Sequence, residues 1–199
     1  MTKMLDVRLS DAFRRLQDTE KIARSIFYNA PLYVPGLLQE PGYAQEMILG
    51  ITGLPGGNSE AVERVKVRNE RHAAFLERLD GDDAPEVHAV IDESVLHRTP
   101  AGSGAMRAQI EHLIQISRKP SVQIGVIPLT HGPHPGLIGS FEVHETADSG
   151  LAFFEGAHGD SVVTDADEIA FYRTRTKSLM KIAASGDDAR KLLSGLLNG

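Results

Sequence analysis

The sequence predicts an α/β protein with a small mixed sheet of about four to five strands, a helical N-terminal layer and C-terminal helices. Two observations predict this class. Apolar residues recur at helical spacing through the first 80 residues, and short β-branched segments alternate with helical ones from residue 86 onward. The length of 199 residues suits one domain. We therefore expect a single domain over 1–199, helical at about 10–80 and α/β at 86–199; a mixed α+β arrangement fits the same order.

The N-terminal layer is expected to begin with an amphipathic helix from Ser10 to about Phe27, because Ser10 is a typical N-cap and apolar residues follow at three- and four-residue intervals. The next segment, Leu32–Gln39, is apolar but interrupted by two glycine or proline positions, which predicts a packed loop. Pro41 suits the first position of a short helix. Asn58 or Ser59 then caps a long helix that ends near Leu79.

The second part of the chain alternates between the two periodicities. We expect strands at Val87–Ile91, Val122–Ile127, Ser140–His144 and Leu151–Glu155. We expect helices at Met106–Ile116, Ala166–Ala184 and Asp187–Leu197.

The composition excludes several classes of site and partner. There is no cysteine, so disulfides, thiolate metal sites and a cysteine nucleophile are excluded. No apolar stretch is long enough for a membrane span and no signal peptide is recognised, so we expect a cytoplasmic protein. The net charge of −6 is unlike the basic surface of a typical DNA binder, and no direct DNA binding is expected.

A series of short motifs runs along the chain in a recognisable order. They are Val34–Gln39 with Tyr43-Ala44, Arg68–Arg71, Val90–Glu93 with Leu96 and Arg98, Met106 with Gln109 and Leu113, Val126–Pro128, Gly132–Gly136 with Gly139 and Phe141, and Glu155. In this order they resemble the C-terminal effector (sensor) domain of antitoxin-like transcriptional regulators that carry an Xre-type helix-turn-helix. His72 departs from the glutamine usual in that family. Since only nine residues precede the first matched helix, we expect the sensor part without its helix-turn-helix.

The resemblance implies a regulatory module that binds an unknown small molecule or partner protein; a homo-oligomer is possible. The expected ligand-binding residues are Arg68, Arg71, Glu93, His134, Phe141 and Glu155. If the long helix packs on the sheet along its apolar stripe, the two arginines should meet the two glutamates within ~4 Å, as structural ion pairs or around a ligand. A partner would dock on Pro35, Leu37, Leu38 and Tyr43, although such a loop is more typical of core.

An enzyme is the alternative interpretation. His134, Glu93 and Glu155 offer acid–base groups, and together with His97, His131 and His144 they offer ligands for a divalent metal. The spacing of these histidines is not specific, so we predict neither a metal nor a cofactor. Gly102-Ser103-Gly104 lacks the lysine and the spacing of a phosphate loop and is expected to be a turn.

Overall fold

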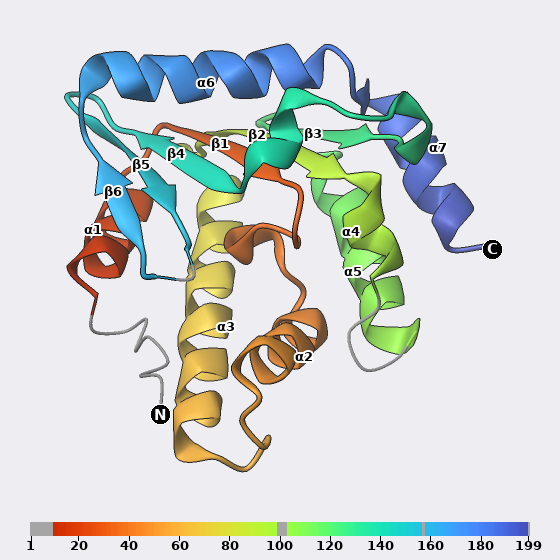
Figure 1. The fold of residues 1–199 in the computed structure, drawn as a ribbon, viewed down its shortest axis with the longest axis horizontal. Helices are drawn as coiled ribbons and strands as arrows, with labels where there is room; N and C mark the ends of the chain where they lie inside the picture. The colour runs from red at the N-terminus through yellow and green to blue at the C-terminus, as the bar shows by residue number, and fades with distance from the viewer. Residues whose placement is uncertain (1–9, 99–102, 157, 199) are drawn as a thin grey trace.

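The computed structural model describes residues 10–98, 103–156 and 158–198. Its centre is a mixed sheet in the order β6-β5-β4-β1-β2-β3-β7 (Figure 1). The strands are β1 (Ser25–Ala30), β2 (Glu86–Asp92), β3 (Val122–Ile127), β4 (Phe141–Glu145), β5 (Gly150–Phe154), β6 (Ser161–Val163) and β7 (Ala184–Ser185). β1, β2 and β3 are parallel neighbours, and the outer strands pair antiparallel. The sequence-based expectation of an α/β class is thus confirmed.

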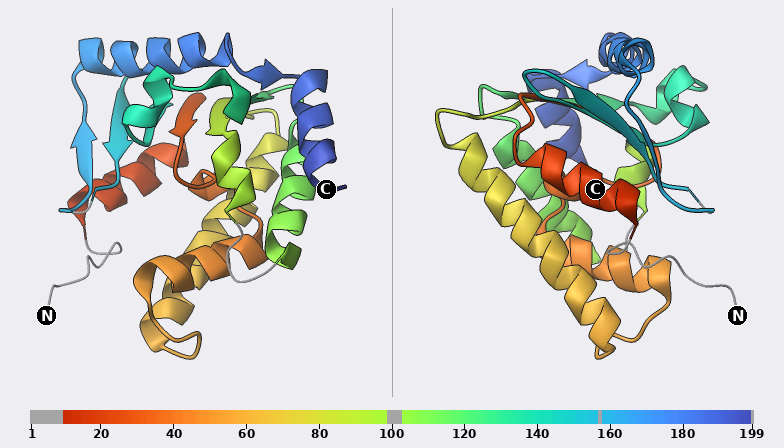
Figure 2. Two further views of the ribbon diagram at one scale, coloured as in Figure 1. Left: turned by 45° about the vertical axis from the view of Figure 1, so that its right-hand side comes forward. Right: turned by 90° about the vertical axis from the view of Figure 1, so that its left-hand side faces the viewer.

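Helices cover both faces of this sheet. They are α1 (Asp11–Glu20), α2 (Pro41–Thr52), α3 (Ser59–Leu79), α4 (Glu93–His97), α5 (Ser103–Ile116), α6 (Ala166–Met180) and α7 (Asp187–Leu196). α6 lies across one face, and α1 and α3 lie on the other, which the edge-on view in Figure 2 separates clearly. The parallel connections β1–β2 and β2–β3 run through α3 and α5. Three short 3-10 turns, η1 (Gly36–Leu38), η2 (Leu129–His131) and η3 (Pro135–Ile138), follow the carboxyl ends of β1 and β3.

Local sequence explains where the helices around the site begin and end. The Asn58 side chain accepts hydrogen bonds from the first backbone amides of α3, and Glu40 does the same for α2. α2 ends at Gly53, whose φ of 65° is left-handed and therefore suits glycine. The cap at Asn58 fixes the start of α3, a straight helix of 21 residues that lies beneath the sheet.

The main core lies between the sheet and the layer of α2, α3 and α5. Three of the residues expected as a docking surface, Leu37, Leu38 and Tyr43, belong to it, and the fourth, Pro35, is also buried. The segment that carries them is a packed connection between β1 and α2, as the sequence predicted. It offers no exposed apolar surface at these four positions.

Three sequence-based expectations were wrong. The helix expected over Ser10–Phe27 ends at Glu20, and residues 25–30 form β1, the middle strand of the sheet. β1 is covered by helices on both faces, so its side chains are nearly all buried and show no alternation that would distinguish strand from helix. The sheet has seven strands among the described residues, not four to five, because β1, β6 and the two-residue β7 were missed. The N-terminal 80 residues are consequently not a purely helical layer.

No helix within the described ranges is long and apolar enough to cross a membrane. Gly102, part of the glycine pair considered above, lies outside the described residues, and Ser103 is the first residue of α5.

Candidate ligand-binding cleft

A narrow cleft opens at the carboxyl end of β1, on the face of the sheet that carries α1 and α3. Its volume is about 50 Å³. Among the described residues, its polar lining consists of eight side chains: Tyr28, Asn29, Tyr33, Arg68, Arg71, Ser140, Glu142 and Glu155. Apolar lining comes from Phe13, Leu16, Phe141 and Phe153. The end of parallel strands is where α/β sheets commonly bind ligands.

Strand register brings the sheet side chains of the cleft together. Tyr28 of β1 lies directly opposite Glu142 of β4, and Ile26 lies opposite His144. Because side chains two residues apart share a face, Glu142 and His144 both point toward α1 and α3. The Tyr28 and His144 rings meet edge to face with centroids 6.0 Å apart. Two neighbouring strands therefore present a phenol, a carboxylate and an imidazole side by side.

Arg71 of α3 is held by Glu20, the last residue of α1. Its Nε donates to one carboxylate oxygen at 2.9 Å and its Nη2 donates to the other, while the guanidinium lies 4.9 Å from the centre of the Phe13 ring. The two side chains are only 13% and 7% exposed. This bidentate pair ties α1 to α3 beneath the sheet.

Arg68 lies one turn earlier on α3 and is paired differently. Its Nη1 donates to the side-chain oxygen of Gln39 at 3.0 Å, and it forms no ion pair with any described carboxylate. A Cβ at position 36 would clash with this guanidinium, so Gly36 leaves the space that Arg68 occupies. Burial, and then the neighbouring Arg71, lower the pKa of Arg68. The cleft thus holds a desolvated cation whose only hydrogen bond among the described residues is to a neutral amide.

Two hydroxyl groups at the cleft also lack partners. The hydroxyl oxygens of Tyr28 and Ser140 are both buried and have no hydrogen-bond partner among the described residues. Tyr28 as a whole is 3% exposed. Burial, and then the negative charges of Glu142 and Glu20, raise the pKa of Tyr28, so this phenol remains a hydrogen-bond donor. An unsatisfied buried hydroxyl costs about 1–3 kcal/mol, and native proteins retain few of them.

The two acidic side chains that line the cleft accept one side-chain hydrogen bond each among the described residues. Glu142 accepts a hydrogen bond from His144 Nε2, at 2.9 Å, with the imidazole protonated on that nitrogen. The exposed Glu155 accepts a hydrogen bond from the Tyr33 hydroxyl, and burial and this carboxylate raise the pKa of Tyr33. Both carboxylates therefore keep further oxygen lone pairs for a ligand.

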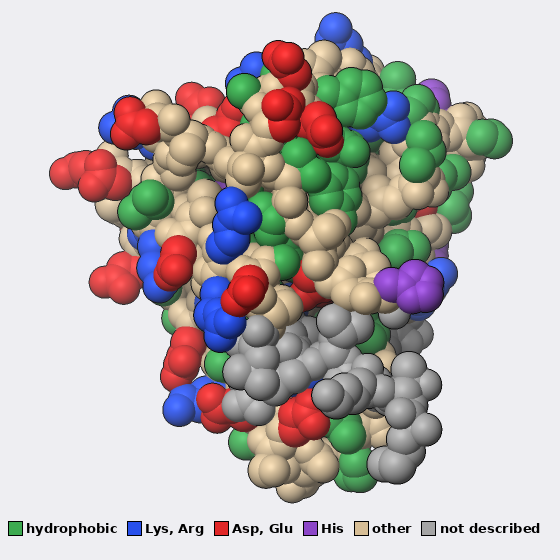
Figure 3. Space-filling view, turned by 60° about the vertical axis from the view of Figure 1, so that its left-hand side comes forward, with side chains coloured by type: hydrophobic (Ala, Val, Ile, Leu, Met, Phe, Trp, Pro, Cys, Tyr) green, Lys and Arg blue, Asp and Glu red, His purple; other side chains and the backbone are tan. Residues whose placement is uncertain are grey.

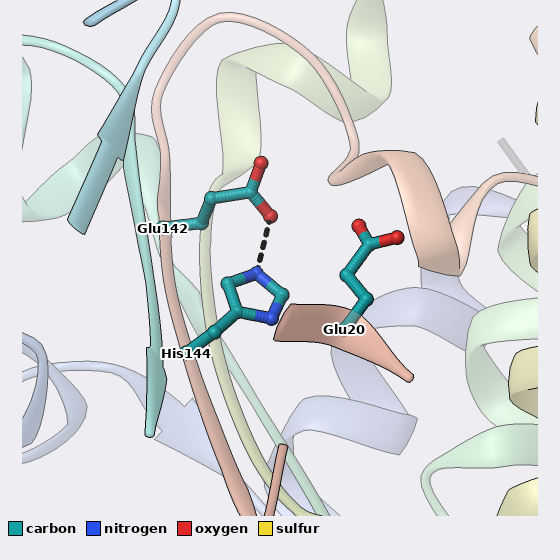
Figure 4. A group of neighbouring side chains, drawn as sticks. All are labelled: Glu20, Glu142 and His144. Carbon is teal, nitrogen blue, oxygen red and sulfur yellow. Dashed lines mark hydrogen bonds and ion pairs between the residues drawn. The ribbon is translucent and has the colours of Figure 1, made fainter. Parts of the chain in front are cut away.

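Glu20, Glu142 and His144 also form a possible metal-binding group (Figure 4). One ligand atom from each lies within 4.8 Å of the others, and the second ring nitrogen of His144, Nδ1, is buried without a partner among the described residues. A carboxylate pair and an imidazole suit zinc and similar ions. However, Glu20 already has both oxygens on Arg71, so a cation here would have to compete with a guanidinium.

The structure brings together only part of the predicted site. Arg68, Arg71, Phe141 and Glu155 all line the cleft. Neither arginine forms an ion pair with Glu93 or Glu155, so the predicted contacts within ~4 Å are wrong.

Glu93 and His134 lie in a separate cluster beyond β2. His134 Nε2 is 2.9 Å from an Asp92 oxygen, and Glu93 interacts with His97 at 3.3 Å and accepts from the Leu129 amide at 2.7 Å. Asp92 is the N-cap of α4, directly at the end of β2, and Glu93 is the first residue of this helix. Their contacts with His134 and Leu129 therefore hold the loop between β3 and β4 against the end of β2. The predicted His134 position above the arginines is therefore wrong.

Sequence reasoning missed Tyr28, Tyr33 and Glu142, which line the cleft, and Glu20, which holds Arg71 there. Glu20 and Tyr28 lie on either side of the break between α1 and β1, which was taken as one helix, and Glu142 faces Tyr28 only through the β1–β4 register. Had β1 been recognised as a strand, the alternation of Glu142 and His144 on β4 would have placed both on the face of Tyr28.

The fold and cleft together define a mixed α/β domain with a buried polar pocket at the end of its parallel strands. The chain belongs to the family described as Domain of unknown function (DUF5753), whose model matches residues 13–195. No curated protein and no solved structure matches the chain.

Proposed function

We propose that this protein is a regulatory module that binds a small molecule in the cleft. The observation that carries the proposal is the Tyr28 hydroxyl, which is buried at the cleft without a partner among the described residues. A ligand that accepts its hydrogen bond would remove the cost of leaving it unpaired. Arg68, whose only hydrogen-bond partner in the described part of the chain is a neutral amide, supports the same conclusion.

A small ligand is preferred over a partner protein or DNA. The apolar residues expected to dock a protein are buried in the core. On the face shown in Figure 3, acidic and basic side chains are interspersed, and the chain carries a net charge of −6, so the proposal involves no direct contact with DNA. The resemblance to sensor domains of Xre-type helix-turn-helix regulators supports a role in transcription regulation through this ligand.

A metal-dependent enzyme is the second candidate, and one specific observation favours it: the convergence of Glu20, Glu142 and His144. In that case the arginine now bound to Glu20 would have to turn away when the ion binds. The imidazole and Glu142 would hold the ion, and Tyr28 would donate a proton or a hydrogen bond beside it. Because this requires breaking a buried bidentate ion pair, we place it second.

Native mass spectrometry of the freshly purified protein tests the proposal. We expect a fraction of the protein to carry a small organic adduct that is released by denaturation. Arg68→Met should lose this adduct, while Lys66→Met, an exposed lysine on the same helix, should keep it. An adduct that Arg68→Met retains would place the ligand elsewhere, and a released divalent metal ion would favour the enzyme.

A further inference from the structure

We infer that the ligand of the cleft is an α-amino acid with a small apolar side chain. Arg68 and the hydroxyls of Tyr28 and Ser140 would bind its carboxylate, and Glu142 and Glu155 would bind its ammonium group. This inference rests on the proposed function, since it names the class of ligand for the same cleft.

The carboxylate half follows from the surroundings of Arg68. A desolvated guanidinium is normally paired with an anion, and its planar fork matches a carboxylate with two parallel hydrogen bonds. Among the described residues Arg68 has only the Gln39 oxygen, on Nη1. Arg71 is not available in the same way, because both oxygens of Glu20 hold it. Within the described ranges, Arg68 is therefore the cation of the cleft that has no paired anion.

The two unpartnered hydroxyls complete a carboxylate site. Tyr28 comes from the middle of the sheet and Ser140 from the residue before β4, and both line the same cleft as Arg68. A carboxylate has about four lone-pair positions, enough to accept from a guanidinium and two hydroxyls together. A neutral carbonyl oxygen would satisfy the hydroxyls but leave the charge of Arg68 without a counter-ion.

The two carboxylates of the cleft call for a cationic group on the ligand as well. With Arg71 neutralised by Glu20, the remaining formal charges are one arginine, Arg68, against two carboxylates, Glu142 and Glu155. A simple anion would have to sit beside both carboxylates, which like-charge repulsion disfavours. A zwitterion supplies one group for each side. The ammonium of an amino acid offers three donors, and Glu142 and Glu155 have free acceptor positions.

The size and lining of the cleft limit the rest of the ligand. A volume of about 50 Å³ is space for only a few water-sized groups, so the head group of a small molecule fills it. The apolar side chains next to the polar groups are Phe13, Leu16 and Phe153. These apolar walls favour a side chain such as that of alanine or valine over a charged or long one.

Isothermal titration calorimetry with the full chain tests the inference, using L-alanine and L-valine as probes within a panel of all twenty L-amino acids. We expect at least one of the small apolar amino acids to bind with a Kd below ~1 mM. 3-Methylbutanoate keeps the carbon skeleton and carboxylate of valine without its amine, and isobutylamine keeps the amine without the carboxylate. Both should bind at least about tenfold more weakly than valine, because each leaves one set of charged groups unpaired.

Two variants locate the binding groups. Arg68→Met removes the charge at nearly constant length and should weaken amino-acid binding by about tenfold or more. Tyr28→Phe removes only the hydroxyl and should weaken binding by about tenfold, while the ligand-free protein melts at the same or a higher temperature, because the variant has no unpaired hydroxyl to bury. Lys66→Met on the exposed side of α3 and Tyr172→Phe on α6, on the opposite face of the sheet, should bind like the wild type.

The inference is overturned if no amino acid of the panel binds, or if 3-methylbutanoate or isobutylamine binds as tightly as valine. If native mass spectrometry still shows an adduct that depends on Arg68, the proposed ligand-binding function stands and only the ligand class is wrong. If there is neither an adduct nor amino-acid binding, the proposed function fails together with the inference. Binding that survives both Arg68→Met and Tyr28→Phe would show that amino acids bind outside the cleft.

Discussion

Replacing Leu38 with aspartate should lower the free energy of unfolding by several kcal/mol. Leu38 is 0% exposed and packs in the main core between the sheet and α2, α3 and α5. The substitution removes the apolar contacts of a leucine and buries a charge without a partner, which together cost several kcal/mol. Since a domain of this size is stable by about 5–15 kcal/mol, such a loss removes much of its stability. Circular dichroism during urea or thermal unfolding measures it.

Leu32→Asp is the matched control, because Leu32 belongs to the same segment between β1 and α2 but is 50% exposed. We expect it to change the free energy of unfolding by less than about 0.5 kcal/mol. Wild-type melting of Leu38→Asp would show that this segment is displayed on the surface, and it would restore the segment as a docking site for a partner.

Removing one member of the Arg71–Glu20 pair should cost about 3–5 kcal/mol, because the other charge is left buried and uncompensated. Arg71→Ala additionally removes the contact of the guanidinium with the Phe13 ring. Glu20→Ala should be similarly destabilising, since it leaves Arg71 in the same buried place without its carboxylate. Chemical unfolding of the two single variants and of the double variant forms a cycle that isolates the pair.

In that cycle the double variant should be clearly less destabilised than the sum of the two single variants, because it leaves no unpaired charge. Arg14→Ala provides a control on α1, where Arg14 and Asp11 form an ion pair whose side chains are 54% and 90% exposed. Its loss should be below about 1 kcal/mol. If Arg71→Ala were as mild as Arg14→Ala, α1 would not be held to α3 by this pair.

Most of the helices could be predicted from the sequence, because their apolar spacing and caps are local signals. α3 is capped by Asn58, one of the two predicted caps, and ends at the predicted Leu79, and α2 starts at Pro41 as expected. β2 and β3 were found because their β-branched runs are bounded by turns. β1 was not found, because its residues are nearly all buried and show no alternation of apolar and polar side chains. The two- and three-residue strands β7 and β6 are too short for any periodic signal.

Site residues could be predicted from the sequence in two cases only. Either they share one side of a helix with other site residues, or the family resemblance implied them. Arg68 and Arg71 were identified because they share one side of α3, and both line the cleft. Their partners Gln39 and Glu20 are 29 and 51 residues away in the chain, and only tertiary packing selects them. Glu93 was assigned to the cleft because it was expected at the end of a strand. It begins α4 directly after β2, and β2 lies one position further from β4 than β1 does.

A high-resolution crystal structure of the protein, purified without a denaturing step, tests the binding cleft most directly. Our account predicts non-protein density in the cleft, within hydrogen-bonding distance of the Tyr28 hydroxyl and of the Arg68 guanidinium, where neither has a carboxylate or hydroxyl partner among the described residues. Density that fits an amino acid would also agree with the further inference. A structure in which the Tyr28 hydroxyl and Arg68 are fully paired with side chains of the protein itself, and the cleft between them is closed, would contradict the account.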